Sequence, residues 1–279
     1  MGDGSRLGKT RTQKRRMKAL SCIVIFTLLF NCKKEPKQIL KVEAETVLPV
    51  LKSDSVQIEP IKISIDKDFV LGKFDYKKDT TFIRVKAIHT TKPVLYIKKE
   101  AYEAFKKMHK AAKADGIDLI IVSGARNFYE QKGIWERKWK RYSNLIPIER
   151  AKKILEYSSM PTTSRHHWGT DIDLNNLNNS HFEKGKGKIV YDWLTNHAND
   201  FGFYQTYTEK SNGRTGYKLE RWHWSYLPLA SQYLKYYNEN INTSDITDFK
   251  GAELAEELNV IHDYVNGVSE SVKSYKVSH

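Results

Sequence analysis

The chain has 279 residues, of which 40% are hydrophobic and 12% aromatic, so it carries enough apolar material to fold around a core. Much of its formal net charge of +14 lies near the N-terminus, where residues 1–18 hold seven basic residues against Asp3 alone. The rest of the chain does not alternate basic and aromatic residues as nucleic-acid-binding modules do. We therefore expect no nucleic-acid partner.

The N-terminal segment has the layout of an export signal. The basic stretch KTRTQKRRMK is followed by the uncharged run ALSCIVIFTLLFNC. Its apolar part, Ala19 to Phe30, is too short to span a bilayer comfortably but has the length of a signal-peptide core. Met17 is an alternative start, because MKALSC already begins such a signal. We expect residues 1–32 to be a signal peptide and the protein to be exported.

The two cysteines, Cys22 and Cys32, lie in or directly after this apolar run. Leu29 stands three residues before Cys32, which resembles the lipobox of bacterial lipoproteins, although Asn31 replaces the usual small residue. The resemblance implies a lipid anchor at Cys32 and attachment to the bacterial cell envelope, in the periplasm; the alternative is that neither thiol has a role. Since no cysteine follows, a metal site in the folded part must use His and carboxylate ligands.

The remaining chain divides into three segments. Residues 33–65 are polar with scattered prolines and are typical of a tether, 66–240 are predicted as the folded body, and 241–279 as a helical extension. The body mixes helices and short strands without regular βαβ alternation, which favours an α+β fold with a small antiparallel sheet and flanking helices.

The predicted elements of the body follow from hydrophobic period and from glycine and proline positions. In chain order they are a helix that buries Ala101, Phe105, Met108 and Ala112 and ends at Gly116, a strand over 117–123, helices in ARNFYEQKGIWERKWKRY and IPIERAKKILEYSSM, a strand in TDIDLNN, a helix in IVYDWLTNHANDFGF closed by Gly202, a hairpin around SNGRTG, and a helix after Pro228.

The C-terminal extension shows helical spacing as well. Leu254, Leu258, Ile261 and Val265 recur at intervals of three and four residues. We expect one more helix there, packed on the body or facing a partner.

Two clusters of polar residues carry the candidate chemistry. The first is SRHHWGTDIDL, from Ser164 to Leu174, and the second is LERWHWSY, from Leu219 to Tyr226. Their density of His and acidic residues fits a metal site, a proton relay or a merely polar loop. Alternation in TDIDLNN places Asp171 and Asp173 on one strand face, so either aspartate is a candidate ligand.

A zinc hydrolase needs three protein ligands, an open position for water, and a base that does not bind the metal. His166, Asp173 and His223 supply such a ligand set, and Glu220, three residues before His223, is free to act as the base. His167 is an alternative to its neighbour His166.

Three segments of the chain resemble motifs of the VanY-type D-alanyl-D-alanine carboxypeptidases, a zinc peptidase family that shares its fold with Hedgehog signalling domains. SRHHWGTDID resembles the family's S-x-H-x-x-G-x-x-x-D signature, ERWHW its E-P-W-H-W motif, and SGARNFYEQ its S-G-Y-R-S-x-x-x-Q segment. The three occur in the family's order. Arg221 replaces the usual proline of the second motif, and Ala125 the usual aromatic residue of the third.

The resemblance implies a Hedgehog/DD-peptidase-like fold, a Zn²⁺ cofactor held by His166, Asp173 and His223, and Glu220 as the catalytic base. It implies that Arg126 pairs with the terminal carboxylate of the substrate, for which its planar guanidinium is suited. Other family positions at the substrate cleft are matched by Ser123, Gln131 and Ser164.

The implied function is zinc-dependent hydrolysis of the stem peptide of peptidoglycan, at its D-Ala-D-Ala end. Two alternatives remain open from the sequence: an endopeptidase that cuts between L-Ala and D-Glu, and a zinc-bearing wall-binding module without catalysis. Arg126 as a plain structural ion pair, and Trp168, Trp222 and Trp224 as packing rather than substrate-stacking residues, also remain open.

Overall fold

The computed structural model describes residues 65–211 and 213–277. The predicted signal peptide, the anchor at Cys32 and the tether up to residue 64 lie outside the described residues. Among the described helices, none is long and apolar enough to cross a membrane.

Seven α-helices and six strands make up the described part, joined by short 3₁₀ turns. The helices are α1 (Lys67–Val70), α2 (Lys99–Ala114), α3 (Phe128–Arg141), α4 (Pro147–Ile154), α5 (Gly185–His197), α6 (Leu227–Asn240) and α7 (Glu270–Lys273). The strands are β1 (Phe82–Arg84), β2 (Tyr96–Lys98), β3 (Ile121–Ser123), β4 (Asp171–Leu174), β5 (Phe203–Gln205) and β6 (His223–Tyr226).

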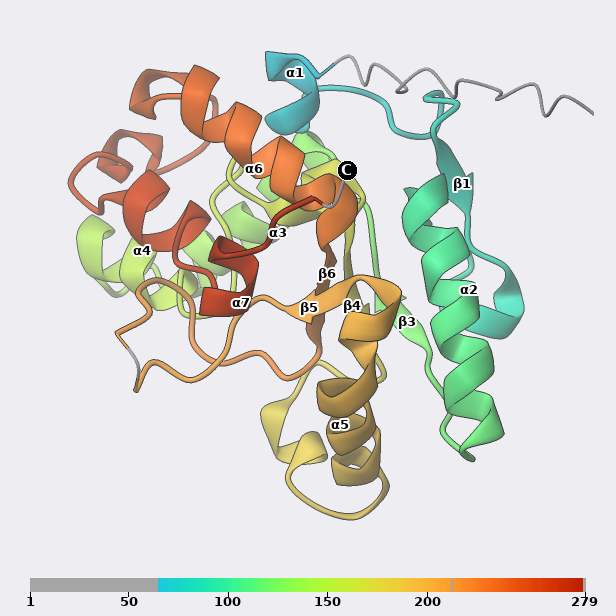
Figure 1. The fold of residues 1–279 in the computed structure, drawn as a ribbon. Helices are drawn as coiled ribbons and strands as arrows, with labels where there is room; N and C mark the ends of the chain where they lie inside the picture. Colours follow the sequence, from blue (N-terminus) through green and yellow to red (C-terminus); the bar gives the residue numbers. More distant parts are fainter. Residues whose placement is uncertain (1–64, 212, 278–279) are drawn as a thin grey trace, which may run out of the picture. The chain divides into compact units, whose positions relative to one another are not determined.

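Four strands form an antiparallel sheet in the order β3-β4-β6-β5, and β1 pairs with β2 in a separate hairpin. Helices flank the sheet (Figure 1), so the predicted α+β class with a small antiparallel sheet is confirmed. The predicted strand over 117–123 is shorter, at Ile121–Ser123. The β1–β2 hairpin was not predicted, because three-residue strands leave too short an alternation to recognise.

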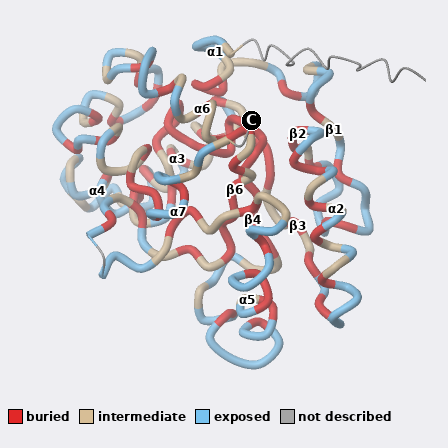
Figure 2. The backbone as a smooth tube through the Cα atoms, in the orientation of Figure 1, coloured by how far each residue is buried: buried red, intermediate tan, exposed pale blue. Residues whose placement is uncertain are grey.

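The two faces of the sheet differ in chemistry. Ile172 and Leu174 of β4 and Trp224 of β6 pack into one core with the apolar faces of α2 and α5. Because side chains alternate along a strand, Asp171, Asp173 and His223 are left on the opposite face. These residues are nevertheless buried (Figure 2), since a second core lies beyond them.

The second core joins α3, α4 and α6 to the segment that follows α6. Trp135 and Trp139 of α3 form part of it. α3 begins with a complete capping box, in which Asn127 accepts from the backbone N–H of Glu130 while the Glu130 carboxylate accepts from that of Asn127. The cap fixes the start of α3 directly after Arg126, one of the predicted substrate-binding residues.

The prediction of a single helix in the C-terminal extension is wrong. The segment breaks into the 3₁₀ turns η5 (Thr243–Asp245) and η6 (Ala252–Leu254), the π-helical turn η7 (Ile261–Val265) and α7. Gly251 interrupts it with φ of +83°, and a Cβ at this position would lie 2.6 Å from the Trp139 ring. Asn259, with φ of +48°, is a second interruption. Leu258 and Val265 do reach the core, as their apolar character predicted.

The strands predicted for the hairpin around SNGRTG do pair, since Phe203 to Gln205 of β5 lie opposite Trp224 to Tyr226 of β6. Their connection is a long loop instead of a tight turn. The buried Arg214 holds it through bonds to the backbone carbonyls of Thr208 (3.1 Å), Tyr217 (2.8 Å) and Gly267 (3.0 Å). This guanidinium therefore ties the loop that leads to Glu220 to the C-terminal segment.

Arg214→Met is expected to lower the free energy of unfolding by about 3 kcal/mol, because it leaves several buried carbonyls without donors. For a protein of this size that corresponds to a fall in Tm of roughly 6–12 °C. Thermal unfolding followed by circular dichroism measures it. Arg137→Met, an exposed arginine of α3, is the control and should leave Tm within about 2 °C of wild type. An equal Tm for Arg214→Met would show that the loop is held by other contacts.

Candidate metal and catalytic site

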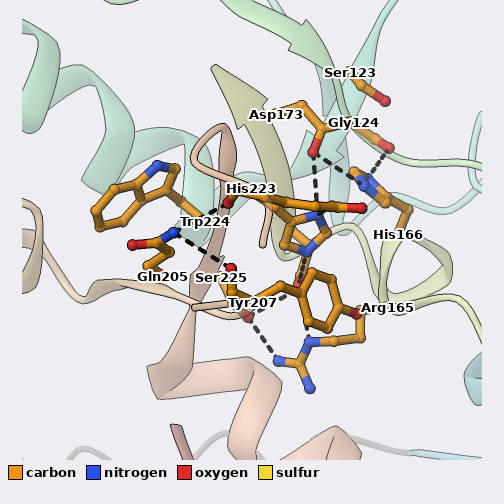
Figure 3. Close-up of polar contacts among 12 residues, drawn as sticks. Ser123, Gly124, Arg165, His166, Asp173, Gln205, Tyr207, His223, Trp224 and Ser225 are labelled. Atoms are coloured by element: carbon orange, nitrogen blue, oxygen red, sulfur yellow. Dashed lines mark hydrogen bonds and ion pairs between the residues drawn. The ribbon is translucent and has the colours of Figure 1, made fainter. Parts of the chain in front are cut away.

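The antiparallel pairing of β4 and β6 creates the centre of the site. Asp173 lies directly opposite His223 in the register of the two strands. His166 comes from η2 (Arg165–Trp168), which ends at Gly169 with φ of +69° and lets the chain turn into β4. One ligand atom from each of His166, Asp173 and His223 lies within 4.8 Å of the others (Figure 3). The three predicted metal ligands are therefore brought together.

Hydrogen bonds orient both imidazoles for ligation. His166 Nδ1 lies 2.8 Å from the carbonyl oxygen of Gly124, so Nδ1 carries the proton and donates it there. The free lone pair is on Nε2, which lies 3.5 Å from Asp173 Oδ1. His223 Nε2 lies 2.9 Å from Asp171 Oδ2, which turns Nδ1 toward Asp173 Oδ1 at 3.1 Å. The donor set is thus two nitrogens and one carboxylate oxygen.

Asp173 Oδ1 itself is buried and has no hydrogen-bond partner among the residues that the structure describes. An acceptor left unpaired in a dry site is costly unless a cation satisfies it. Burial lowers the pKa of His223, but the hydrogen bond to Asp171 and the charge of Asp173 outweigh it and raise that pKa to about 9. At that pKa the His223 ring keeps a second proton near neutral pH, on Nδ1. A divalent cation bound at Nδ1 would take the place of this proton, so the residues present fit a metal ion.

Glu220 lies beside the ligand set without belonging to it. Its Oε2 is 3.5 Å from His223 Nδ1, and its backbone N–H donates to the carbonyl of Tyr207. Burial, reinforced by the nearby Asp173, raises the pKa of its carboxyl to about 8, against the opposing charges of His223 and Arg126. A carboxyl group with its pKa near neutrality is suited to exchange a proton during a reaction.

A cavity of about 520 Å³ opens onto these groups. His166, Asp173, His223 and Glu220 line it together with Arg126 and Gln131. Six predicted site residues from three separate stretches of sequence therefore share one cavity.

Arg126 is held in a fixed orientation. Its Nε donates to Gln131 Oε1 at 3.1 Å, and one terminal nitrogen donates to Ser123 Oγ at 2.7 Å. Gln131 is anchored in turn, because its amide donates to the carbonyl of Ser159 at 2.8 Å. Arg126 has no acidic partner within 4.0 Å in the described chain, which disfavours its alternative reading as a structural ion pair.

The structure does not bring Ser123 and Ser164 to the cavity lining. Ser123 lies behind Arg126 and binds its guanidinium. The hydroxyl of Ser164 is buried just before η2 and lacks a partner within the described residues. His167 also points away from the ligand set, since its Nδ1 binds the carbonyl of Arg126 at 2.7 Å.

Sequence reasoning underrated a buried network behind His223. Asp171 Oδ2 accepts from Arg165 Nε at 2.9 Å as well as from His223, and its Oδ1 accepts from Ser225 Oγ at 2.8 Å. Arg165 and His223 hold the pKa of Asp171 below its ordinary value, although burial acts in the opposite direction. The alternation of β4 placed Asp171 on the correct face, but no sequence motif marks Arg165 as its partner.

Further cavity residues escaped prediction because no motif contains them. Tyr207, in the loop after β5, places its ring 4.7 Å from the His223 ring, measured between centroids. Lys138 lines the cavity from α3, and Tyr157 from the turn after α4. Only the helical spacing of Lys138 from Gln131, seven residues, carried a signal in the sequence.

Residues 94–229 match the family model VanY, D-alanyl-D-alanine carboxypeptidase. YodJ of Bacillus subtilis, to which carboxypeptidase activity is ascribed, is 31% identical over 138 residues, which are 47% of this chain and 46% of YodJ. The D-alanyl-D-alanine carboxypeptidase of Enterococcus faecalis is 32% identical over 123 residues, 43% of this chain and 44% of the relative. The chain thus spans just under half the length of these curated relatives.

Solved structures similar to this chain include VanYB in complex with D-alanine-D-alanine, with a TM-score of 0.46 and 23% identity over 66% of this chain and 91% of that one. The LD-carboxypeptidase LdcB has the same TM-score and identity, over 61% of this chain and 77% of that one. A VanY D,D-pentapeptidase in complex with Zn(II) has a TM-score of 0.43 and 24% identity, over 56% and 88%.

The family match covers all three sequence motifs and every residue of the site. The resemblance seen in the sequence is confirmed, since residues 94–229 match the VanY family model and both curated relatives carry carboxypeptidase names.

Proposed function

We propose that this protein is a zinc-dependent carboxypeptidase that removes the terminal D-alanine from peptidoglycan stem peptides. The observation that carries the proposal is the convergence of His166 Nε2, Asp173 Oδ1 and His223 Nδ1 in a cavity that also contains Glu220 and Arg126. The VanY family match and the D-alanyl-D-alanine carboxypeptidase of Enterococcus faecalis among the relatives support it.

Zinc is the metal that this donor set favours. Two imidazole nitrogens and one carboxylate oxygen are a usual ligand set of catalytic zinc when thiolates are absent. The hydrogen bonds from His166 to Gly124 and from His223 to Asp171 are the kind of outer contacts that fix zinc-binding histidines. The solved VanY D,D-pentapeptidase is named as a complex with Zn(II), which supports the same metal here.

When bound, zinc supplies Lewis acidity that acidifies a water molecule and polarises the carbonyl of the cleaved bond. Glu220 accepts the proton of the attacking water at its carboxylate and returns it to the amine that leaves.

Arg126 selects the end of the peptide. Its guanidinium, held by Ser123 and Gln131, is a preorganised donor fork for a carboxylate. A free C-terminal carboxylate at Arg126 would place the last peptide bond at the metal side of the cavity. VanYB is named as a complex with D-alanine-D-alanine, a ligand with such a terminus.

We further propose that the protein acts in the cell envelope, exported by residues 1–32 and anchored through a lipid on Cys32. The basic stretch, the apolar run and the spacing of Leu29 and Cys32 support this. Stem peptides occur outside the cytoplasmic membrane, where such a protein would meet them.

The full chain loaded with zinc is expected to release D-alanine from a muropeptide that carries a pentapeptide stem. Amidation of the terminal carboxylate should lower kcat/KM at least tenfold, because Arg126 then loses a charge-assisted partner. Removal of zinc by a chelator should abolish release, and added zinc should restore it. Mass spectra of the products identify the cleaved bond: fragments cut between L-Ala and D-Glu would establish the endopeptidase alternative, and intact peptide at stoichiometric zinc the non-catalytic one.

A further inference from the structure

One basic residue of the cavity has no assigned partner. Lys138 lines the cavity from α3 and is partly buried. Within residues 65–211 and 213–277 its ammonium group makes neither a hydrogen bond nor an ion pair, whereas the other half-buried lysines do, such as Lys73 with Asp248. A partly desolvated ammonium without a partner is unfavourable, so it is a candidate for binding an anion.

The position of Lys138 on α3 separates it from Arg126. Gln131, Ile134 and Lys138 line the cavity from one face of the helix, at the spacing i, i+3, i+7. Gln131 holds the guanidinium of Arg126 at 3.1 Å. Since a helix rises 1.5 Å per residue, the backbone of Lys138 lies roughly 10 Å further along the axis than that of Gln131.

The charges around Lys138 disfavour an internal role. Burial lowers the pKa of its ammonium group, the charge of Glu220 raises it, and those of Arg126 and Arg141 lower it. Glu220, the acidic group of the cavity that acts on it, is not within 4.0 Å, and an internal salt bridge between the two is not formed. The cavity therefore offers two cationic side chains, Arg126 and Lys138.

An extended peptide advances about 3.3–3.6 Å per residue, so the helix rise from Gln131, which holds Arg126, to Lys138 matches two or three residues. If the terminal carboxylate binds Arg126, the group near Lys138 belongs to the second or third residue of a pentapeptide stem. Both residues can carry a free carboxylate there: the α-carboxyl of a γ-linked D-glutamate, or the side-chain carboxyl of a diaminopimelate.

We propose that Lys138 binds a free carboxylate on the second or third residue of the stem peptide and makes the protein selective for stems that carry it. The inference rests on the proposed carboxypeptidase function and adds a specificity-determining residue to it. Amidation of the D-glutamate removes the free carboxylate of the second residue. Replacement of diaminopimelate by lysine removes the side-chain carboxylate of the third. One of these two changes therefore removes the partner of Lys138.

The experiment compares four pentapeptides with a free D-Ala-D-Ala end, which combine D-glutamate or its α-amide at the second residue with diaminopimelate or lysine at the third. We expect wild type to lose about tenfold in kcat/KM when one of the two carboxylates is removed. Which substitution causes the loss identifies the residue that Lys138 binds.

Lys138→Met should abolish this discrimination. It should cleave all four peptides at the rate at which wild type cleaves the poor substrates. Lys140→Met, a change of the same kind at an exposed position of α3, is the control and should keep the discrimination. The inference is overturned if wild type cleaves all four peptides equally, or if Lys138→Met lowers all four rates by the same factor, as it would by acting through Glu220. Absence of cleavage by wild type would overturn the carboxypeptidase proposal itself.

Discussion

Glu220→Gln is expected to lower kcat for D-alanine release by about 10²–10⁴-fold while the zinc content stays at one ion per chain. Glutamine keeps the size of the buried side chain but cannot accept a proton from water. Because Glu220 lies outside the set formed by His166, Asp173 and His223, the ligands are untouched by the substitution. Steady-state kinetics and metal analysis of the same sample measure the two quantities.

The matched control is Glu209→Gln, in the same loop after β5 but exposed. It should change neither kcat nor zinc content. A Glu220→Gln protein that hydrolyses at the wild-type rate would show that the base lies elsewhere. Joint loss of zinc and activity would instead make Glu220 a metal ligand.

Much of the site could be predicted from the sequence because its residues obey local rules. Strict alternation in TDIDL put Asp171 and Asp173 on one face of a strand, and the structure has both there. Helical spacing predicted the buried face of α2 through Phe105 and Met108. Ordered motifs then linked distant segments that no local rule connects.

The parts that were missed depend on packing between distant segments. Arg214 satisfies carbonyls from two separate stretches, and nothing in its sequence neighbourhood announces that role. The extension kept its apolar spacing but not its helix, because Asn259 takes a left-handed backbone with φ of +48° inside the spaced residues. Lys138 lines the cavity because α3 packs with its Gln131 and Ile134 face toward the site, and this packing depends on segments distant in the sequence.

The network behind His223 leads to the second large effect. Asp171 is fully buried and accepts four hydrogen bonds, from His223, Arg165, Ser225 and Thr170. Its charge fixes the His223 tautomer in which Nε2 carries the proton and Nδ1 faces Asp173. Asp171 is thus a positioning residue: it acts on the metal site through His223 and does not contact the cavity.

Asp171→Asn is expected to weaken zinc binding by about 10–100-fold, because a neutral amide holds the His223 tautomer less firmly than a carboxylate. Competition with a chelator of known affinity measures the change. Without metal, the raised pKa of His223 means that both ring nitrogens carry protons near neutral pH, and loss of the Asp171 charge should lower that pKa, which an NMR titration of the ring measures. Asp192→Asn, at an exposed aspartate of α5, is the control and should bind zinc as wild type does.

The same substitution leaves Arg165 as a buried cation without its anion, which is expected to cost about 3–5 kcal/mol of unfolding free energy. The double variant Arg165→Met, Asp171→Asn removes both charges and separates stability from positioning. We expect it to recover much of the unfolding free energy yet to keep the weakened zinc affinity, since His223 still lacks its charged acceptor. Recovery of zinc affinity together with stability would show that the network serves the fold alone, and that Asp173 and His166 suffice to orient the site.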